Sequence, residues 1–256
     1  FVLALTEMSW SGAFFLGVPL VGFLLRSSGL LAPFLLISAL SLISLLGVVY
    51  LIPSDPPTLE DQPGLLENFN AVLGSRGALA GLSVSVLIAG ANEVVNVVFV
   101  VWLNESFALQ IAALGGASAV IGLSELIGEG AVSLFSDAIS KKVAVLVGIL
   151  SSSAAALCLI FLGRTRAGAV LGLFLFYLTF EFTIVSIIPM MTGVLPEARA
   201  TIMALNIASV SLGRGLGSLA AAPLYSLGFG FNALTGAGLN LLAALALSWV
   251  TVKENQ

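Results

Sequence analysis

Histidine does not occur in this sequence of 256 residues. Its absence excludes zinc sites with histidine ligands, catalytic triads that contain histidine, and proton relays through imidazole. Any proton transfer by this chain must therefore use carboxylates. Cysteine occurs once, as Cys158 within an apolar run. The chain can form no internal disulfide, and we expect this thiol to pack as a small hydrophobic side chain.

Charged residues are also scarce, at 9% of the sequence, whereas hydrophobic residues make up 59%. Soluble domains carry about 25% charged residues, and the mean hydropathy here is +1.15, so lipid must be the solvent. The net charge of −4 offers no basic surface for nucleic acid. Strands of a membrane barrel would alternate apolar and polar residues, but Leu30–Ile52 is continuously apolar. The predicted fold class is an all-α integral membrane bundle.

Eight apolar stretches are long enough to cross a bilayer, which takes roughly 20 residues per helix. We therefore expect a bundle of eight transmembrane helices, most of them joined by very short connections. The predicted helices are Phe1–Leu25, Leu30–Ile52, Ala78–Leu103, Leu109–Phe135, Val143–Leu162, Ala167–Met191, Ile202–Leu224 and Phe231–Val252.

One connection is long, and it separates two predicted helices from six. This segment, Pro53–Gly77, contains four prolines, which disfavour helix, and four acidic residues, which keep it in water. Towards its end, apolar residues from Leu65 to Leu73 recur at helical spacing. This pattern predicts a short amphipathic helix on the membrane surface. We interpret it as a structural part of the linker without a functional role of its own.

Lysine and arginine in the short loops indicate the orientation of the bundle. If the linker is cytoplasmic, five basic residues lie on that side, namely Arg76, Lys141, Lys142, Arg199 and Lys253. The other side then holds three, namely Arg26, Arg164 and Arg166. We therefore expect a multi-pass protein of the plasma membrane with a cytoplasmic linker and C-terminus. Because the chain starts on Phe1 inside an apolar stretch, we also expect it to be part of a longer protein.

The first and seventh predicted helices resemble one another. The shared features are Gly12, Gly17, Pro19 and Gly22 in the first and Gly213, Gly217 and Pro223 in the seventh. Parallel repeats occur in transporters whose halves are related by an axis along the membrane normal, so a repeat six helices apart predicts a six-plus-six design. The pairs Gly213–Gly217 and Gly168–Gly172 also have the small-residue spacing that lets helices approach closely.

The loop between the fourth and fifth predicted helices, Ser136–Lys142, carries a recognisable motif. Asp137, Lys141 and Lys142 match the loop signature of the major facilitator superfamily, with serines at its two glycine positions. The loop therefore resembles that signature. The resemblance implies that these residues, together with Glu129, form a gating contact between the two halves.

The first helix resembles the fifth-helix signature of the drug:proton antiporters in the same superfamily, through Gly17, Pro19 and Gly22. This resemblance implies that the chain comprises helices five to twelve of a twelve-helix facilitator. Residues 1–52 would be the last two helices of the N-terminal half, 53–77 the cytoplasmic linker, and 78–256 the C-terminal six-helix half. The first four helices, and with them half of the substrate cavity, would be missing.

Polar side chains in the third predicted helix are candidates for a substrate or proton site. Asn92, Glu93 and Asn96 lie near its middle; Asn92 and Asn96 share a face, and Glu93 meets Asn96 at i,i+3. Such residues either hold helices together by hydrogen bonds or line a cavity. We favour the cavity, because ionisable residues inside a membrane usually serve function.

Two more carboxylates lie one turn apart in the fourth predicted helix. Glu125 is the deeper of the two and is a site candidate, whereas Glu129 lies nearer the cytoplasmic end. In the sixth predicted helix Glu181 follows Tyr177 by one turn, and Arg214 lies mid-helix in the seventh. A buried arginine nearly always has a partner, so Arg214 could pair with one of the glutamates.

The balance of buried charge suggests proton binding. Four glutamates, at positions 93, 125, 129 and 181, face the single interior arginine, so about three lack an obvious cation. Desolvation favours the protonated form of a carboxylic acid, which suits a group that alternates between two aqueous sides. Glu7 is a further candidate in the first helix.

These observations favour a secondary transporter of a bacterial-type plasma membrane. We expect proton-coupled export of a small organic solute by alternating access, with the bilayer, protons and solute as partners and no cofactor. The alternatives are a proton-coupled importer of a sugar or metabolite and, from another class, an integral membrane enzyme. The enzyme is disfavoured because the sequence offers no nucleophile or metal cluster at the membrane interface.

Overall fold

The computed structural model describes residues 16–51, 64–109, 111–135 and 139–252. Within these segments every element of regular structure is a helix. The predicted all-α fold class is therefore confirmed for the part of the chain that the structure describes.

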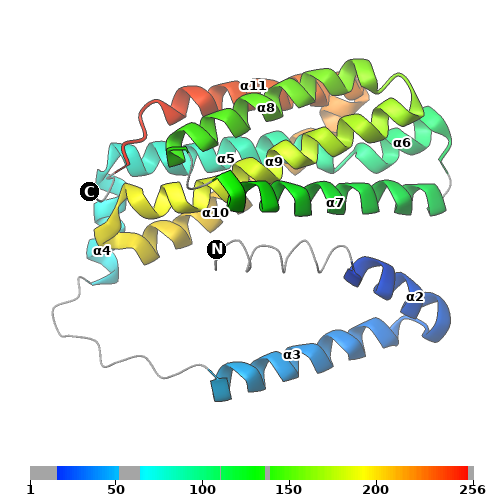
Figure 1. Ribbon diagram of the computed structural model, residues 1–256, viewed down its shortest axis with the longest axis horizontal. Helices are drawn as coiled ribbons and strands as arrows, with labels where there is room; N and C mark the ends of the chain where they lie inside the picture. The colour runs from blue at the N-terminus through cyan, green and yellow to red at the C-terminus, as the bar shows by residue number, and fades with distance from the viewer. Residues whose placement is uncertain (1–15, 52–63, 110, 136–138, 253–256) are drawn as a thin grey trace.

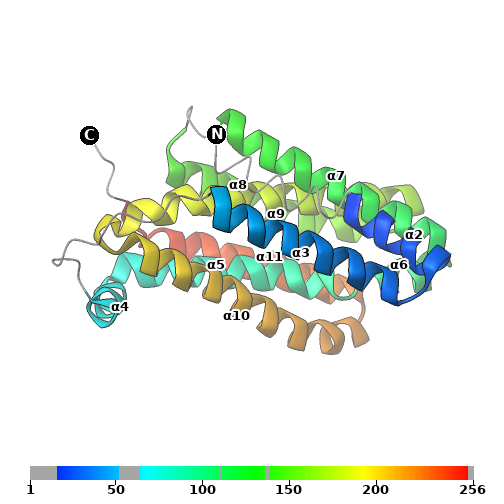
Figure 2. The ribbon, with the colours of Figure 1, turned by 90° about the horizontal axis from the view of Figure 1, so that it is seen from below.

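Six long helices form the main bundle. The central helix, α5, packs against α9, α10 and α11, while α8 packs against α9 and α11, and α7 against α9. Figure 2 shows α7 and α10 at opposite edges of the bundle with α5 and α9 between them. The bounds are Arg76–Asn96 for α5, Ile111–Phe135 for α7, Lys141–Leu162 for α8, Arg166–Val194 for α9, Arg199–Ser226 for α10 and Phe229–Leu247 for α11.

The first two described helices, α2 (Val18–Ser28) and α3 (Leu31–Leu51), pack on one another. Figure 1 shows them apart from the main bundle, with α8 and α11 on the bundle side away from α3. Pro33 is the one buried residue of α3. The pair therefore presents an apolar surface along almost its whole length.

Six helices of the described chain are long and apolar enough to cross a membrane. They are Leu31–Leu51, Arg76–Phe107, Lys141–Leu162, Arg166–Val194, Pro196–Ser226 and Phe229–Leu247. The predicted helix Phe1–Leu25 falls largely outside the described residues. At 25 residues, α7 also has the length of a span. The predicted total of eight therefore stays a prediction.

The structure corrects the predicted third helix. Ala78–Leu103 was expected to be continuous, but α5 ends at Asn96 and a separate helix, α6 (Phe99–Phe107), follows. Val98, between them, has φ −108° and ψ −10°. Between Val94 and Val101 six of eight residues are valine, and β-branched side chains lose rotamer freedom in a helix. This run is where helical geometry is weakest, and the helix breaks inside it.

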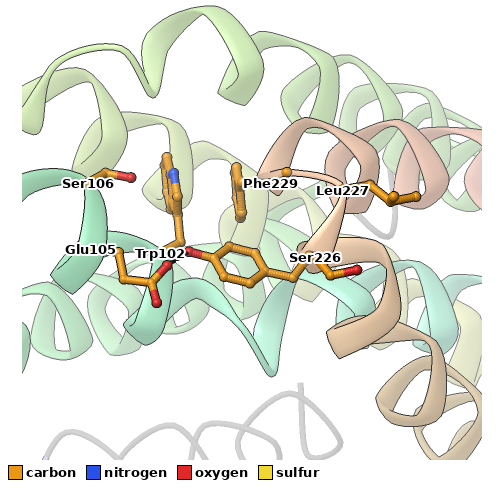
Figure 3. Close-up of a pocket in the computed structure, with 8 residues that line it drawn as sticks. Trp102, Glu105, Ser106, Ser226, Leu227 and Phe229 are labelled. Carbon is orange, nitrogen blue, oxygen red and sulfur yellow. Dashed lines mark hydrogen bonds between the residues drawn. The ribbon is translucent and has the colours of Figure 1, made fainter.

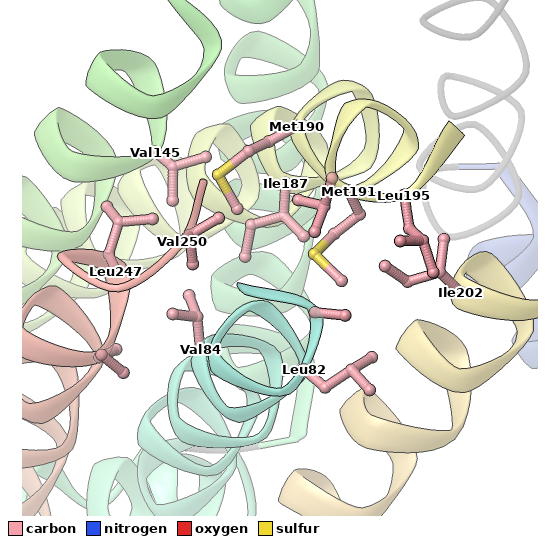
Figure 4. Close-up of a cluster of buried hydrophobic side chains, with 14 of the residues drawn as sticks. Leu82, Val84, Val145, Ile187, Met190, Met191, Leu195, Ile202, Leu247 and Val250 are labelled. Atoms are coloured by element: carbon pink, nitrogen blue, oxygen red, sulfur yellow. The ribbon is translucent and has the colours of Figure 1, made fainter. Parts of the chain in front are cut away.

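Two buried apolar clusters hold the bundle together, one toward each end. The cluster in Figure 4 joins residues of several helices, among them Val84 of α5, Val145 of α8, Met190 of α9, Ile202 of α10 and Leu247 of α11. The second cluster gathers around Trp102, Phe176 and other residues toward α6. Lipid tails are as apolar as these side chains, so close packing and interhelical hydrogen bonds, not transfer out of water, stabilise the contacts.

Glycines permit the closest helix crossings, as the sequence predicted. A Cβ on Gly213 would collide with the carbonyl oxygen of Val86 in α5, and a Cβ on Gly217 would lie 2.9 Å from the carbonyl oxygen of Gly90. Gly172 likewise lies against Leu159 of α8. The role predicted for these glycines in close packing is confirmed.

The short helix predicted at the end of the linker is present as α4 (Leu65–Gly74). Leu65 is 85% exposed, whereas Val72 is fully buried and anchors α4 in the cluster of Figure 4. Figure 1 shows α4 at the end of the bundle opposite α6. The predicted helix is thus present, and its amphipathic location on a membrane surface stays a prediction.

Candidate functional site

A hydrogen-bonded network of four side chains joins three helices near the end of α5. Asn96 Nδ2 donates to Glu93 Oε2 at 3.4 Å, and Tyr177 Oη of α9 donates to Asn96 Oδ1 at 2.6 Å. Ser218 Oγ of α10 donates to the second carboxylate oxygen, Glu93 Oε1, at 3.3 Å. The structure thus brings the predicted residues Glu93 and Asn96 together and adds Tyr177 and Ser218 as their partners.

The close crossing of α5 and α10 places the Glu93 carboxylate. A Cβ on Gly217 would lie 2.8 Å from Glu93 Cβ and 3.2 Å from Gly90 Cα, so any side chain there would push α10 away. With glycine at this position, Ser218 reaches the carboxylate from the adjacent residue. Glu93 and Asn96 are half-buried and Tyr177 is 2% exposed, so the network lies at the boundary between the packed interior and its surface.

The structure places Asn92 outside this network. Its side chain is 4% exposed, and among the described residues its Nδ2 atom has no hydrogen-bond partner. An unsatisfied buried donor costs about 1–3 kcal/mol. The Nδ2 atom of Asn92 is therefore a buried, unsatisfied donor in the interior of the bundle, one turn before Asn96.

Two further candidates lie on helices at opposite edges of the bundle, Glu125 on α7 and Arg214 on α10. Arg214 is exposed and Glu125 is half-buried. The sequence predicts a buried Arg214, whereas the structure exposes it, and its pairing with a glutamate stays a prediction.

The other two predicted carboxylates are buried. Glu129 is 0% exposed and Glu181 is 8% exposed. Gly128 brings α7 against α9 beside them: a Cβ on Gly128 would lie 2.8 Å from the Leu178 carbonyl oxygen and 3.0 Å from Glu181 Cβ. Glu181 therefore belongs to the α7–α9 contact.

The predicted gating loop is described only in part, since Asp137 lies outside the described residues. Lys142 Nζ donates to the carbonyl oxygens of Ser248 at 3.2 Å and Val250 at 2.7 Å, just beyond the end of α11. Lys141 is exposed. A cation at a helix C-terminus complements the helix dipole, so Lys142 fastens the start of α8 to the end of α11.

The residues of the predicted fifth-helix motif lie at the start of α2. A Cβ on Gly17 or Gly22 would meet no described atom within 4 Å, and Pro19 is in the first turn of α2. Within the described chain these residues contact neither the network nor the gating loop. Their role as a motif stays a prediction.

An open pocket of about 440 Å³ lies at the α6 end of the bundle. Figure 3 shows it between α6 and the turn that joins α10 to α11. Trp102 stacks on Phe229 with ring centroids 3.7 Å apart, and Tyr225 Oη donates to Glu105 Oε2 at 2.6 Å. The sequence patterns did not indicate this pocket. Aromatic pairs at helix ends were the signal available, and they are not specific.

A bundle of long apolar helices with ionisable side chains partly buried among them is typical of multi-pass membrane proteins. The family comparison agrees: residues 1–218 match the Major Facilitator Superfamily. An uncharacterised MFS-type transporter, YceJ of Bacillus subtilis (strain 168), is 30% identical over 229 residues, which is 86% of this chain and 56% of that protein. This chain belongs to the major facilitator superfamily. It spans about half the length of the curated relative that it matches.

The predicted family is thus confirmed. Members of this superfamily move small solutes within a lipid bilayer.

Proposed function

We propose that this protein exports a small organic solute across the plasma membrane in exchange for protons, by alternating access. The linker and C-terminus would face the cytoplasm, residues 1–52 would close the N-terminal half, and residues 78–256 would form the C-terminal half. The observation that carries the proposal is the network of Glu93, Asn96, Tyr177 and Ser218.

Protonation of the Glu93 carboxylate can change the contact between α5 and α10. When ionised, Glu93 accepts hydrogen bonds from Asn96 of its own helix and Ser218 of α10. Both bonds are long, at 3.4 and 3.3 Å, and therefore weak. Protonation removes the negative charge that strengthens both hydrogen bonds and converts one carboxylate oxygen into a donor. Proton binding would thus loosen the contact between α5 and α10.

The other residues of the network orient the groups around the Glu93 carboxylate. Tyr177 Oη fixes the orientation of the Asn96 amide, because a hydroxyl that donates to Oδ1 leaves Nδ2 to face Glu93. Glu125 of α7 and Arg214 of α10 place further charged residues on helices at the two edges of the bundle. A charged solute or a proton that reaches this region would act on α5, α7, α9 and α10 at once.

The alternative is import of a sugar or metabolite together with protons, since the same carboxylates serve either direction. The complete protein in proteoliposomes distinguishes the two with one panel of radiolabelled solutes and pH gradients of opposite sign. An exchanger accumulates solute when the vesicle interior is acidic, because protons leave as solute enters. A symporter accumulates solute when the exterior is acidic. Uptake that is the same under both gradients and without one would contradict proton coupling.

A further inference from the structure

The break between α5 and α6 leaves the Val94 carbonyl without its usual helical donor. In a continuous helix the Val98 N–H would donate to Val94, four residues earlier. Here the Val98 N–H donates to Val95 O at 3.2 Å, one residue closer. The carbonyl oxygen of Val94 instead accepts a hydrogen bond from Asn232 Nδ2 of α11 at 2.7 Å. A side chain from another helix therefore occupies the place of the missing helical bond.

Asn232 is held in this position by burial and by two hydrogen bonds to backbone carbonyls. It is 0% exposed, and its Nδ2 also donates to the carbonyl oxygen of Ala221 in α10 at 2.8 Å. Both acceptors are carbonyls, so only the amide nitrogen can face them, and the orientation of the side chain is determined. Its Oδ1 atom has no partner among the described residues. The side chain thus satisfies the two backbone oxygens while its own acceptor remains unsatisfied.

The second acceptor, the Ala221 carbonyl, lies in α10 two residues before Pro223. Nearby, α6 packs on the turn after α10 through the stacked rings of Trp102 and Phe229. α6 therefore begins at the break beside Asn232 and contacts this turn through Trp102, three residues after its first residue.

We propose that Asn232 replaces the helical hydrogen bond missing at the α5–α6 break and thereby sets the position of α6 over the α10–α11 turn. Asn232 is a positioning residue in this role. The inference does not depend on proton coupling, because it concerns where α6 lies and not what the network around Glu93 binds.

Hydrogen–deuterium exchange of the complete protein tests the proposal without a transport assay. Asn232→Leu keeps the branched shape of the side chain and removes both N–H donors. Asn240→Leu is the matched control, because Asn240 is a buried asparagine of the same helix that donates instead to Ser152 of α8, at 3.2 Å. We expect the amides of residues 102–107 to exchange about 10-fold faster in Asn232→Leu, the effect of losing one to two hydrogen bonds. In Asn240→Leu these amides should exchange at the wild-type rate.

A purely structural role would accelerate exchange in all helices to the same degree, and that result would overturn the proposal. So would exchange of residues 102–107 within 2-fold of wild type. If Asn232→Leu does not fold, Asn232→Ser gives the same decision, because its shorter hydroxyl can reach one carbonyl at most. That variant should raise exchange of residues 102–107 by about 3-fold and leave α8 unchanged, and uniform or absent acceleration would refute the proposal.

Discussion

Replacing Gly213 by alanine should separate α5 from α10 and destabilise the bundle. The added Cβ would collide with the Val86 carbonyl oxygen, and it would lie 2.9 Å from the Val86 carbonyl carbon and 3.0 Å from Ala89 Cβ. Carbon atoms pack at about 3.5–4.0 Å, so the helices must move apart by roughly 1 Å. Overpacking of this kind costs about 1–3 kcal/mol, against a gain of about 0.5–1 kcal/mol from the better helix propensity of alanine.

The net loss of about 1–2 kcal/mol corresponds to a fall in Tm of roughly 2–8 °C for a chain of this size. Gly215→Ala is the control within the same helix, because a Cβ there would meet no described atom within 4 Å. It should leave Tm unchanged or raise it by a few degrees. The assay is thermal unfolding of each purified variant in detergent, followed by near-UV circular dichroism. A Tm for Gly213→Ala equal to or above that of Gly215→Ala would refute the close-crossing argument.

Three further predictions concern the network and the loop. Tyr177→Phe keeps the ring but removes the donor to Asn96 Oδ1, so unfolding free energy should fall by about 0.5–1.5 kcal/mol; an unchanged Tm would contradict the bond. Lys142→Met should lower stability by about 1 kcal/mol because it removes the cation at the end of α11, whereas Lys141→Met should stay within about 0.5 kcal/mol; equal Tm values for the two would contradict the assignment. Asp137→Asn should slow exchange between inward- and outward-facing states, measured by single-molecule fluorescence, with solute affinity within a few-fold; loss of binding at an unchanged rate would indicate a substrate role.

The long helices could be predicted because continuous apolar runs bounded by glycine, proline and charge leave few alternatives. α3 and α8 begin and end within two residues of the predicted bounds. The break at Val98 was missed because a hydropathy argument treats an apolar run as one span. The valines around Val98 carried the signal, since their low helix propensity is independent of their hydropathy.

The site could be predicted only within single helices. The i,i+3 spacing of Glu93 and Asn96 implies their contact, but the partners Tyr177 and Ser218 depend on how α9 and α10 dock. Likewise, the charge balance predicts a glutamate partner for Arg214 without indicating which glutamate it is. The motif match predicts that Lys142 belongs to a gating loop. In the structure Lys142 donates to backbone carbonyls, which every residue has, so the sequence could not indicate these acceptors.

The most direct test of proton coupling compares accumulation with exchange in proteoliposomes that contain the complete protein. Glu93→Gln keeps the shape of the side chain but cannot bind and release a proton, so it should abolish accumulation driven by a pH gradient. Exchange of labelled for unlabelled solute should persist, because exchange needs alternating access and no net proton movement. Glu125→Gln and Glu181→Gln are tested in parallel, and a purely structural glutamate should lower Tm without selective uncoupling. Wild-type accumulation from a pH gradient in all three variants would contradict the account.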